Sequence, residues 1–298
     1  MKGRALIVLQ ARLASRRLPG KALALIGDRP MLARCLDRLQ ASSAGTLVLA
    51  TTMNREDDTL AAVAIGQGVP VVRGPEADVL RRFLMVAERF GAEYIIRAKA
   101  NSPAVDIDAP RRVLQTLIGT DVDYVTESGL PWGAAVEAVT VDALHRADAM
   151  AADASDREHV TQLVRCNRLF QALEVAAPVD VRRPDLCLTV DTPHDLVYMR
   201  RVLSAFGDDT SALPLSAIVA AADALTLRSE VLPNDYRDPP GRFATAPQRG
   251  LDRGDRTDAG HARLVDDRRH DAGARGPGGT GEPDYPVQGC RGSVGRRP

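Results

Sequence analysis

The sequence predicts a doubly wound α/β protein with a mostly parallel sheet, and three observations support this prediction. Short runs of branched apolar residues, which suit buried strands, alternate along the chain with segments of helical periodicity. The connections between them are short, as they are in β-α-β units. No internal repeat interrupts the alternation. Because such sheets bind ligands beyond the carboxyl ends of their strands, the residues that follow each strand are the candidate site residues.

The first half of the chain begins with an apolar run, Ala-Leu-Ile-Val-Leu at 5–9, whose length and branching predict a buried central strand. The predicted strands of this half are residues 5–9, 46–51, 69–73 and 94–98. The predicted helices are a segment that opens at Pro30, residues 56–65 and residues 78–90. In the last of these, apolar residues recur three and four positions apart and so define one inward face.

The second half continues the same alternation as far as about residue 206. Its predicted strands are residues 124–126, 136–139 and 186–190. Its predicted helices are residues 108–118, residues 141–150, one that begins at 156 and one that runs to about residue 203. Asp191-Thr192-Pro193 is a good N-terminal cap for the last helix. We predict one α/β domain over residues 1–228.

Residues 229–298 differ in composition from the rest of the chain. They hold 12 of the 24 glycines and 8 of the 19 prolines. Few branched aliphatic residues remain there, so this segment has too little apolar surface to form a core. We predict a disordered tail.

The overall composition excludes several classes of protein. The formal net charge of +0 gives no general attraction to nucleic acid or to an anionic membrane, so neither is an expected partner. The four cysteines lack Cys-x-x-Cys spacing, which argues against a zinc site. No apolar run is long enough to span a bilayer, and the first apolar run is too short for a signal peptide. We therefore expect a cytoplasmic protein.

The loop at 10–21, which follows the first strand, is the strongest candidate for a binding site. It carries four cations, Arg12, Arg16, Arg17 and Lys21, and no acidic residue. Such crowding of positive charge is unfavourable unless a polyanion such as a triphosphate neutralises it. A solvated basic loop is the alternative. The spacing is not that of a Walker phosphate-binding loop.

The same loop resembles the signature of the cytidylyltransferases that make CMP-activated sugars, among them the 3-deoxy-manno-octulosonate and acylneuraminate enzymes. The matching residues are Arg12, Ser15, Arg17, Leu18, Pro19, Gly20 and Lys21. The resemblance covers about residues 5–206 and is greatest to the branch called spore coat polysaccharide biosynthesis protein F. It implies a sheet of the nucleotide-diphospho-sugar transferase type. The implied reaction is that of CTP with a sugar or sugar acid to give a CMP-sugar and pyrophosphate, with Mg²⁺ as cofactor.

The resemblance also implies roles for residues near the nucleotide. The nucleotide would contact residues of the first loop and of an Arg-Gly-x-x-x-Asp-Val-Leu match, namely Ala11, Arg12, Ser15, Arg17, Lys21, Arg73 and Asp78. Arg12, Arg17 and Lys21 would neutralise the charge that builds on departing pyrophosphate. The catalytic residues are expected to be Arg12, Lys21 and Lys99, of which Lys99 would place a fixed positive charge near the metal position.

Two positions, 101 and 191, are implied as metal ligands, and one of them departs from the branch. Asp191 lies in a full match to Val-Asp-Thr-Pro-x-Asp-Leu, although N-capping is its alternative role. Asn101 stands where the branch has a metal-binding Asp, so it keeps a carbonyl oxygen and loses the charge. Lys99 precedes Asn101 by two residues, which places both on one face of a continued strand. Asp106 is a further acid near these two positions that could serve the metal site. The alternative is that it is a solvated loop residue.

The sugar is expected to contact Glu137, Arg157, Glu158 and His159. Glu137 lies on an apolar strand, so it either binds sugar hydroxyls or a cation, or faces solvent on a sheet edge. Arg157, Glu158 and His159 belong to an Arg-Glu-His-Val-Thr match and would contact a sugar carboxylate or a second subunit, which leaves a homodimer open. For His159, a hydrogen-bonded helix residue is the alternative.

Two other functions remain open. A glycosyltransferase on a similar sheet would use an Asp-x-Asp metal motif, and Asp106-Ile107-Asp108 has that form. A non-catalytic nucleotide-binding protein is suggested by Asn101. The main prediction is a CTP-dependent nucleotidyltransferase.

Overall fold

The computed structural model describes residues 4–231, with side chains as far as residue 225. The predicted disordered tail lies outside these residues, apart from its first three positions. The predicted domain limit at residue 228 falls inside a helix, α9 (Leu215–Val231). None of the helices in residues 4–231 is both long and apolar enough to cross a membrane.

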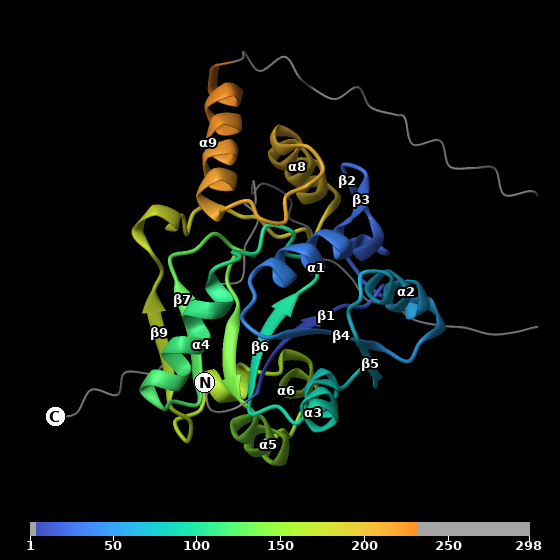
Figure 1. The fold of residues 1–298 in the computed structure, drawn as a ribbon, viewed down its shortest axis with the longest axis vertical. Helices are drawn as coiled ribbons and strands as arrows, with labels where there is room; N and C mark the ends of the chain where they lie inside the picture. Colours follow the sequence, from blue (N-terminus) through green and yellow to red (C-terminus); the bar gives the residue numbers. More distant parts are fainter. Residues whose placement is uncertain (1–3, 232–298) are drawn as a thin grey trace, which may run out of the picture. The chain divides into compact units, whose positions relative to one another are not determined.

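A seven-stranded sheet forms the centre of the domain (Figure 1). The strands in spatial order are β5 (Val71–Gly74), β4 (Thr46–Thr52), β1 (Ala5–Gln10), β6 (Tyr94–Lys99), β8 (Glu137–Thr140), β7 (Tyr124–Ser128) and β9 (Ala172–Ala176). Of these, β8 alone runs antiparallel to its neighbours. The prediction of a mostly parallel, doubly wound sheet is therefore confirmed. A two-stranded hairpin, β2 (Leu25–Ile26) and β3 (Arg29–Pro30), follows the first loop and was not predicted.

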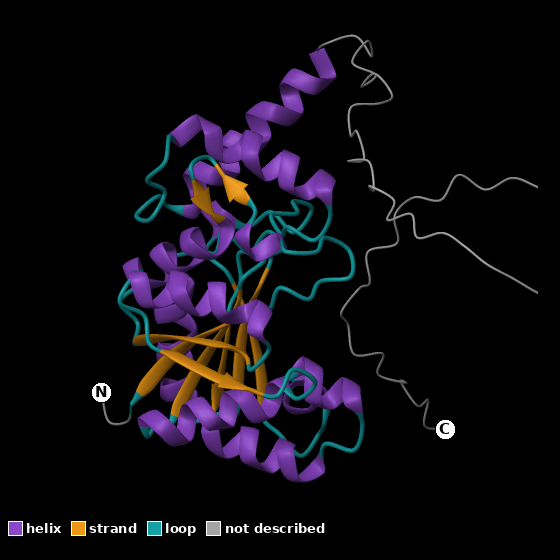
Figure 2. Ribbon diagram, turned by 90° about the vertical axis from the view of Figure 1, so that its right-hand side faces the viewer, coloured by secondary structure: helices purple, strands orange, loops and turns teal. Residues whose placement is uncertain are grey.

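Helices cover both faces of the sheet, and Figure 2 shows the strands between two helical layers. One face packs against α1 (Met31–Ala41), α2 (Asp58–Gly66) and α4 (Ala109–Thr120), with α8 (Pro193–Leu203) and α9 continuing this core. The other face packs against α3 (Val79–Phe90), α5 (Val141–Met150) and α7 (Gln162–Cys166), with α6 (Ala154–His159) against α3. Short 3₁₀ turns lie at Lys21–Leu23, Arg55–Asp57, Val179–Val181 and Ser204–Phe206.

The central strand β1 is buried on both sides, as its apolar run predicts. Leu6 and Val8 belong to the core beneath α3, whereas Ile7 and Leu9 belong to the core beneath α1. Alternate side chains of a strand point to opposite faces, so one five-residue run supplies both cores. The strand ends at Gln10, which pairs in register with Lys99 of β6, so both strands deliver their following loops to the same edge.

The predicted strand at 186–190 is wrong. Within residues 4–231, this segment makes only a single bridge, between Trp132 and Cys187. Its backbone bonds instead to loops, because Leu188 N donates to Trp132 O at 2.8 Å and Val190 N donates to Asn101 O at 2.8 Å. The segment is an extended link that holds the start of α8 beside the turn after β6.

The helix predicted to begin at 156 is two short helices. The first, α6, ends at His159 because Val160 has a φ of 54°, a left-handed conformation that a β-branched residue rarely adopts. Thr161 is then the N-cap of α7, which begins at Gln162 and was not predicted separately. The edge strand β9 was also missed.

Candidate active site

The loop from residue 11 to 20 is held in place at the carboxyl end of β1 by a buried acid. Asp57 is 2% exposed and accepts a hydrogen bond from Leu13 N at 2.8 Å and another from the Thr52 hydroxyl. Gly20 closes the loop with a φ of 70° and donates its N–H to Leu13 O at 3.2 Å. Sequence reasoning missed Asp57, although its place just after the strand 46–52 was a usable signal.

Asp191 is the point at which three segments of the site meet. Its Oδ1 lies 2.5 Å from Lys21 Nζ and 3.1 Å from Arg17 Nη2, and it accepts a hydrogen bond from Asn101 Nδ2 at 3.1 Å. Lys21 and Arg17 come from the first loop, whereas Asn101 comes from the turn after β6. The structure thus brings together four residues that the sequence predicted to share a site.

The alternative role of Asp191, capping α8, is wrong. The N-cap is Thr192, whose hydroxyl accepts from Asp195 N at 3.2 Å. The Asp195 carboxylate accepts in return from the N–H groups of Thr192 and Asp191, at 2.8 and 2.9 Å. This capping box fixes the backbone at Asp191 and leaves its carboxylate free to face the loop.

The charge of Asp191 is stabilised by these neighbours. Burial raises the pKa of the carboxyl group. The hydrogen bond and charge of Lys21, the hydrogen bond from Asn101 and the charge of Arg17 lower the pKa, and together they outweigh burial. The pKa therefore lies below its ordinary value, and the group is ionised at neutral pH.

The oxygen ligands that Asn101 and Asp191 can offer suit a metal ion only if a phosphate group also binds it. Asp191 Oδ2 accepts no hydrogen bond from residues 4–225, so one carboxylate oxygen is open. No group of three or more His, Cys, Asp or Glu side chains that could hold a metal ion occurs in the part of the chain that the structure describes. Mg²⁺ commonly binds through one or two carboxylates and substrate phosphates, which matches this arrangement.

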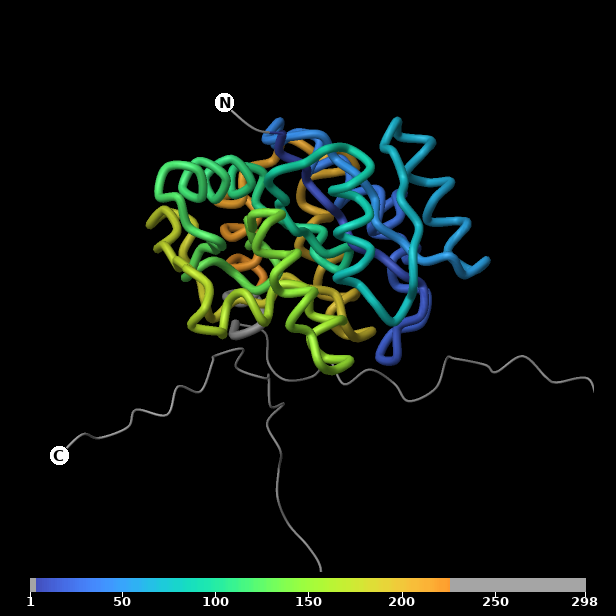
Figure 3. The backbone as a smooth tube through the Cα atoms, turned by 90° about the horizontal axis from the view of Figure 1, so that it is seen from below, coloured from blue at the N-terminus to red at the C-terminus, as the bar shows by residue number. Residues whose placement is uncertain are grey.

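Three of the four cations of the first loop are paired with acids from distant parts of the chain. Arg12 Nη2 lies 2.9 Å from Glu158 Oε1, and its Nη1 lies 3.9 Å from Glu76 Oε1. Figure 3 shows the blue loop after β1 beside the yellow-green segment that contains α6, at the lower edge of the view. The chain therefore supplies its own anions where the sequence suggested an unpaired basic cluster.

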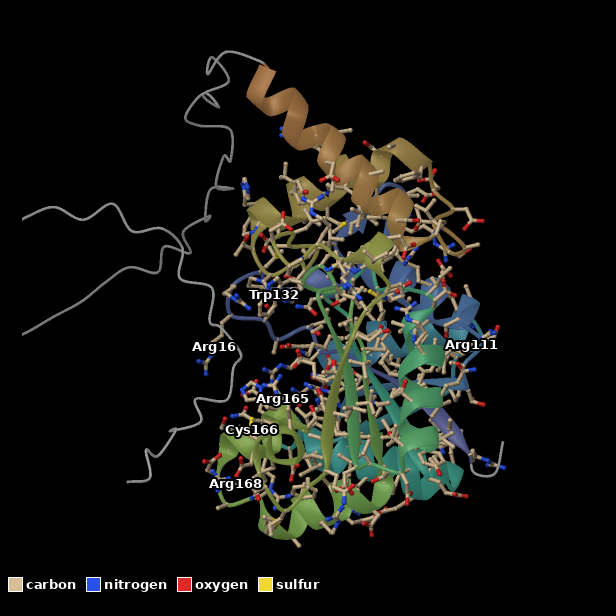
Figure 4. All side chains as sticks on the ribbon, turned by 90° about the vertical axis from the view of Figure 1, so that its left-hand side faces the viewer. Arg16, Arg111, Trp132, Arg165, Cys166 and Arg168 are labelled. Atoms are coloured by element: carbon tan, nitrogen blue, oxygen red, sulfur yellow. The ribbon has the colours of Figure 1, made fainter. Side chains whose placement is uncertain are left out.

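The other residues predicted in this loop have simpler surroundings. Ala11 is buried, and its N–H donates to Ala50 O at 3.2 Å. Ser15 is half-buried and Arg16 is exposed, and neither side chain has a hydrogen-bond or ion-pair partner among the described residues. In Figure 4, Arg16 points away from the body of the molecule.

A buried ion pair lies on the sheet beside the loop. Arg97 Nη1 of β6 lies 2.7 Å from Glu137 Oε2 of β8, and it donates to Thr161 Oγ1 at 3.0 Å. Thr161 donates to the same Glu137 oxygen at 2.8 Å, and Arg97 Nε donates to Gln10 Oε1 at 3.0 Å. Because β8 lies between β6 and β7, the alternative that Glu137 faces solvent on a sheet edge is wrong.

Burial raises the pKa of Glu137, but the positive charges of Arg97 and Lys99 and the hydrogen bonds from Arg97 and Thr161 outweigh it. The resulting pKa is about 2. Glu137 is therefore an ionised, paired group at neutral pH.

Lys99 occupies the end of β6 and is exposed to solvent. The positive charge of Arg97 lowers the pKa of Lys99 most, followed by partial desolvation; the charge of Glu137 raises it, Arg165 lowers it and Asp191 raises it. Arg165 lies on α7 and is half-buried. Sequence reasoning missed Arg165, since a lone arginine on a short helix carries no signal.

Three further predicted residues contact protein groups. Arg73 donates to Thr52 O and Asn54 O, both at 2.7 Å, and its Nη1 lies 2.5 Å from Asp58 Oδ1. Asp78 caps α3 by accepting from Arg81 N at 2.8 Å. Arg157 pairs with Asp148, and its Nη1 also lies 3.3 Å from Asp78 Oδ2.

The remaining sugar-site candidate, His159, is exposed, and its imidazole makes no hydrogen bond to the described side chains or backbone. The alternative of a hydrogen-bonded helix histidine is therefore not observed. Glu158 is the partner of Arg12 described above.

Asp106 is neither an open metal ligand nor a solvated acid. It is 2% exposed, and Arg112 Nη2 lies 2.6 Å from its Oδ2. The same arginine binds Glu127, with Nε 2.6 Å from Oε1. The Asp106-Ile107-Asp108 match therefore offers no open Asp-x-Asp metal motif, which removes the support for a glycosyltransferase.

The mostly parallel sheet, with a cationic loop after its first strand facing one aspartate, defines an α/β domain with the nucleotidyltransferase fold. The family model described as cytidylyltransferase matches residues 6–205, so the chain belongs to the cytidylyltransferase family.

Three comparisons place the chain among known proteins. The spore coat polysaccharide biosynthesis protein SpsF of Bacillus subtilis is 32% identical over 223 residues, which are 72% of this chain and 93% of that protein. A 3-deoxy-manno-octulosonate cytidylyltransferase of Agrobacterium fabrum is 33% identical over 128 residues, 41% of this chain and 50% of that protein. The structure of a cytidylyltransferase from Leptospira borgpetersenii has the same fold, with a TM-score of 0.69 and 24% identity over 78% of this chain and 98% of that chain.

Proposed function

We propose that this protein transfers CMP from CTP to a sugar or sugar acid and releases pyrophosphate. The observation that carries the proposal is the convergence of Lys21, Arg17 and Asn101 on Asp191 at the carboxyl edge of the sheet. The family membership and the names of the two relatives support the choice of CTP and of a sugar acceptor.

The chain's own residues account for triphosphate binding. The phosphates would take the places of Glu158 and Asp191 as partners of Arg12, Arg17 and Lys21. These cations would neutralise the charge that develops on pyrophosphate as the bond between the α-phosphorus and its bridging oxygen breaks. An acceptor oxygen would form the new bond to the α-phosphorus from the opposite side and lose its proton to solvent. Asp191 and Asn101 would hold Mg²⁺, which supplies positive charge to the phosphate oxygens when it is bound.

One observation favours a second candidate, a nucleotide-binding protein without turnover. Position 101 is an asparagine and not an aspartate, so it supplies no second carboxylate for a metal ion. Its amide N–H donates to Asp191 instead. The test is to incubate the protein with each nucleoside triphosphate, Mg²⁺ and a panel of sugars and sugar acids, and to follow pyrophosphate release. Nucleotide binding is measured in parallel by calorimetry.

We expect pyrophosphate release with CTP and an acceptor, and Lys21→Ala should abolish it. CTP binding without release from any acceptor would favour the second candidate. Failure to bind any nucleoside triphosphate would contradict both.

A further inference from the structure

Asp57 is a buried acid whose side chain bonds away from its own helix. It occupies the N-cap position of α2 and is 2% exposed, yet its side chain makes no capping hydrogen bond to that helix. Its carboxylate instead accepts from Leu13 N at 2.8 Å and from the Thr52 hydroxyl. A buried carboxylate is unfavourable unless hydrogen bonds satisfy it, so these two bonds account for its burial. The position of Asp57 is therefore explained by the first loop and not by α2.

Leu13, the residue that Asp57 holds, is the fixed point of the first loop. Its N–H donates to Asp57, its carbonyl oxygen accepts from Gly20 N at 3.2 Å, and its side chain packs against the core beneath α1. Arg12 directly precedes it, and Arg17 lies between Leu13 and Gly20. The bond to Asp57 therefore sets the backbone from which these cations project.

Asp57 is itself held in place by the end of β4. The Thr52 hydroxyl, which donates to Asp57, also accepts from Asn54 N at 3.2 Å. Arg73 donates to Thr52 O and to Asn54 O, both at 2.7 Å. A continuous set of hydrogen bonds thus joins Arg73, a predicted nucleotide contact, to the first loop through Asp57.

The negative charge of Asp57 also acts on a buried arginine. Burial, the largest effect, lowers the pKa of Arg82, and the charge of Arg12 lowers it as well, whereas Asp57 and two other acids raise it. A charge effect on Arg82 is therefore the alternative to an effect through Leu13. Asparagine at position 57 separates the two, because it keeps an acceptor oxygen and loses the charge.

We propose that Asp57 is a positioning residue for the proposed reaction. Through its bond to Leu13 N it holds the first loop in the one conformation in which the loop cations bind a polyphosphate. The inference rests on the proposed function, because it concerns the same loop. Asp57 acts through the backbone of Leu13 and not by contact with the nucleotide. A loop that is ordered beforehand loses less conformational freedom when the ligand binds, which strengthens binding.

The test combines calorimetric titration with inorganic triphosphate, a probe of the loop cations, and hydrogen exchange of the Leu13 N–H in the protein without ligand. Asp57→Ala should weaken triphosphate binding about tenfold, because a hydrogen bond to a buried carboxylate is lost. It should also speed exchange at Leu13 more than exchange in the neighbouring strand β4. Asp57→Asn should restore most of both properties, since its amide can accept from Leu13 N and donate to the Thr52 hydroxyl.

Glu127→Ala is the matched control. Glu127 is also a buried acid, but it pairs with Arg112, which keeps Asp106 as a partner when Glu127 is removed. This variant should lose stability and still bind triphosphate as the wild-type protein does, with no selective change in exchange at Leu13. The comparison separates positioning of the loop from a general loss of stability.

Thr52→Val is a second variant that leaves Asp57 in place, for use if Asp57→Ala does not fold. It removes the hydroxyl that bonds the carboxylate, so it should weaken triphosphate binding and speed exchange at Leu13 by smaller factors than Asp57→Ala. Wild-type affinity and wild-type exchange in both Asp57→Ala and Thr52→Val would overturn the inference. Equal losses in Asp57→Asn and Asp57→Ala would also overturn it, because the charge and not the bond to Leu13 would then be responsible.

The proposed function is tested separately by pyrophosphate release from CTP. Triphosphate binding that depends on Asp57, without pyrophosphate release in the presence of any acceptor, would contradict the proposed function and leave the role of Asp57 standing. Failure of the wild-type protein to bind triphosphate would contradict the role of Asp57 directly.

Discussion

At the level of single residues, the ion pairs of the first loop determine what a triphosphate must displace. Arg12 is held by Glu158, and Lys21 and Arg17 are held by Asp191. Under the proposed function, a nucleotide would therefore exchange protein carboxylates for phosphates instead of filling an unpaired site. The binding free energy gained at each cation would be smaller than that of a new charge-assisted hydrogen bond, because an existing ion pair is lost.

Removing a competing carboxylate should consequently strengthen nucleotide binding. We expect Glu158→Gln to lower the Kd for CTP by up to about fivefold, because an exposed ion pair is worth about 0.2–1 kcal/mol. Arg12→Ala should raise the Kd by about tenfold or more. Calorimetric titration measures both, and Glu76→Gln, whose carboxylate lies farther from Arg12 at 3.9 Å, should have a smaller effect than Glu158→Gln. Weaker binding by Glu158→Gln would show that Glu158 itself contacts a ligand.

Asn101 is the residue at which metal dependence can be altered. Asn101→Asp replaces a 3.1 Å hydrogen bond to Asp191 with two like charges, so the free energy of unfolding without metal should fall by about 1–3 kcal/mol. Adding Mg²⁺ should restore the free energy of unfolding of this variant, whereas that of the wild-type protein without nucleotide should change little with Mg²⁺. Thermal unfolding across a Mg²⁺ series measures this, with Asn167→Asp as the control, because the side-chain oxygen of Asn167 accepts from Leu169 N at 3.0 Å and an aspartate can keep that bond. A variant that ignores Mg²⁺ would indicate that Lys99 neutralises the new carboxylate.

At the level of elements, the site is assembled where α6 and α7 meet β6 and β8. The positive φ of Val160 ends α6 and turns the chain, so that Glu158 faces the first loop while Thr161 faces Arg97. The sequence predicted one helix here, because its helical periodicity continues through Val160. The direction in which Glu158 and Thr161 point depends on how α6 and α7 pack against β6 and β8. Local periodicity does not specify that packing.

The β6–β8 pair should make stability depend on acid pH through Glu137. Its folded pKa of about 2 lies below its ordinary value of 4.5, so the folded state favours the ionised form. The stabilisation is therefore present above about pH 4.5 and is lost as the pH falls through about 2. Glu137→Gln leaves Arg97 buried without a counter-charge and should cost on the order of 3 kcal/mol at pH 7.

The measurement is urea unfolding of the wild-type protein and Glu137→Gln between pH 7 and pH 2. The difference in unfolding free energy between the wild-type protein and Glu137→Gln should shrink as the pH falls towards 2. Glu127, which pairs with Arg112, provides a second buried ion pair for comparison through Glu127→Gln. A difference that stays constant down to pH 2 would contradict the ion pair as its source.

At the level of the whole molecule, the sheet and most helices could be predicted, because apolar periodicity specifies them locally. The four predicted strands of the first half and the helix 141–150 are observed within a few residues of the predicted ends. That the first loop lies beside Asn101 followed from the rule that strand ends share an edge. Asp191 was placed with them by the resemblance alone, because the strand predicted before it is not formed. The pairing of Arg12 with Glu158 could not be predicted, since the two residues are 146 positions apart in the sequence.

The extent of the folding unit is the remaining property of the whole molecule that can be tested. In the part of the chain that the structure describes, residues 5–225 supply both apolar cores, and the family match ends at residue 205. A chain that ends after Val231, the last residue of α9, should therefore unfold cooperatively at nearly the full-length temperature and keep its affinity for CTP. Thermal unfolding and calorimetry measure the two properties.

A shorter chain that ends at Pro214 is the matched control, because it also removes α9. Leu215, Ile218 and Ala222 of this helix are buried against the core beneath α1. Burying a large aliphatic side chain contributes about 1.5–3 kcal/mol, so this chain should lose several kilocalories of stability, whereas the chain ending at Val231 should not. If both chains were equally destabilised, residues beyond 231 would have to contribute to the fold, and the α/β domain would extend past α9.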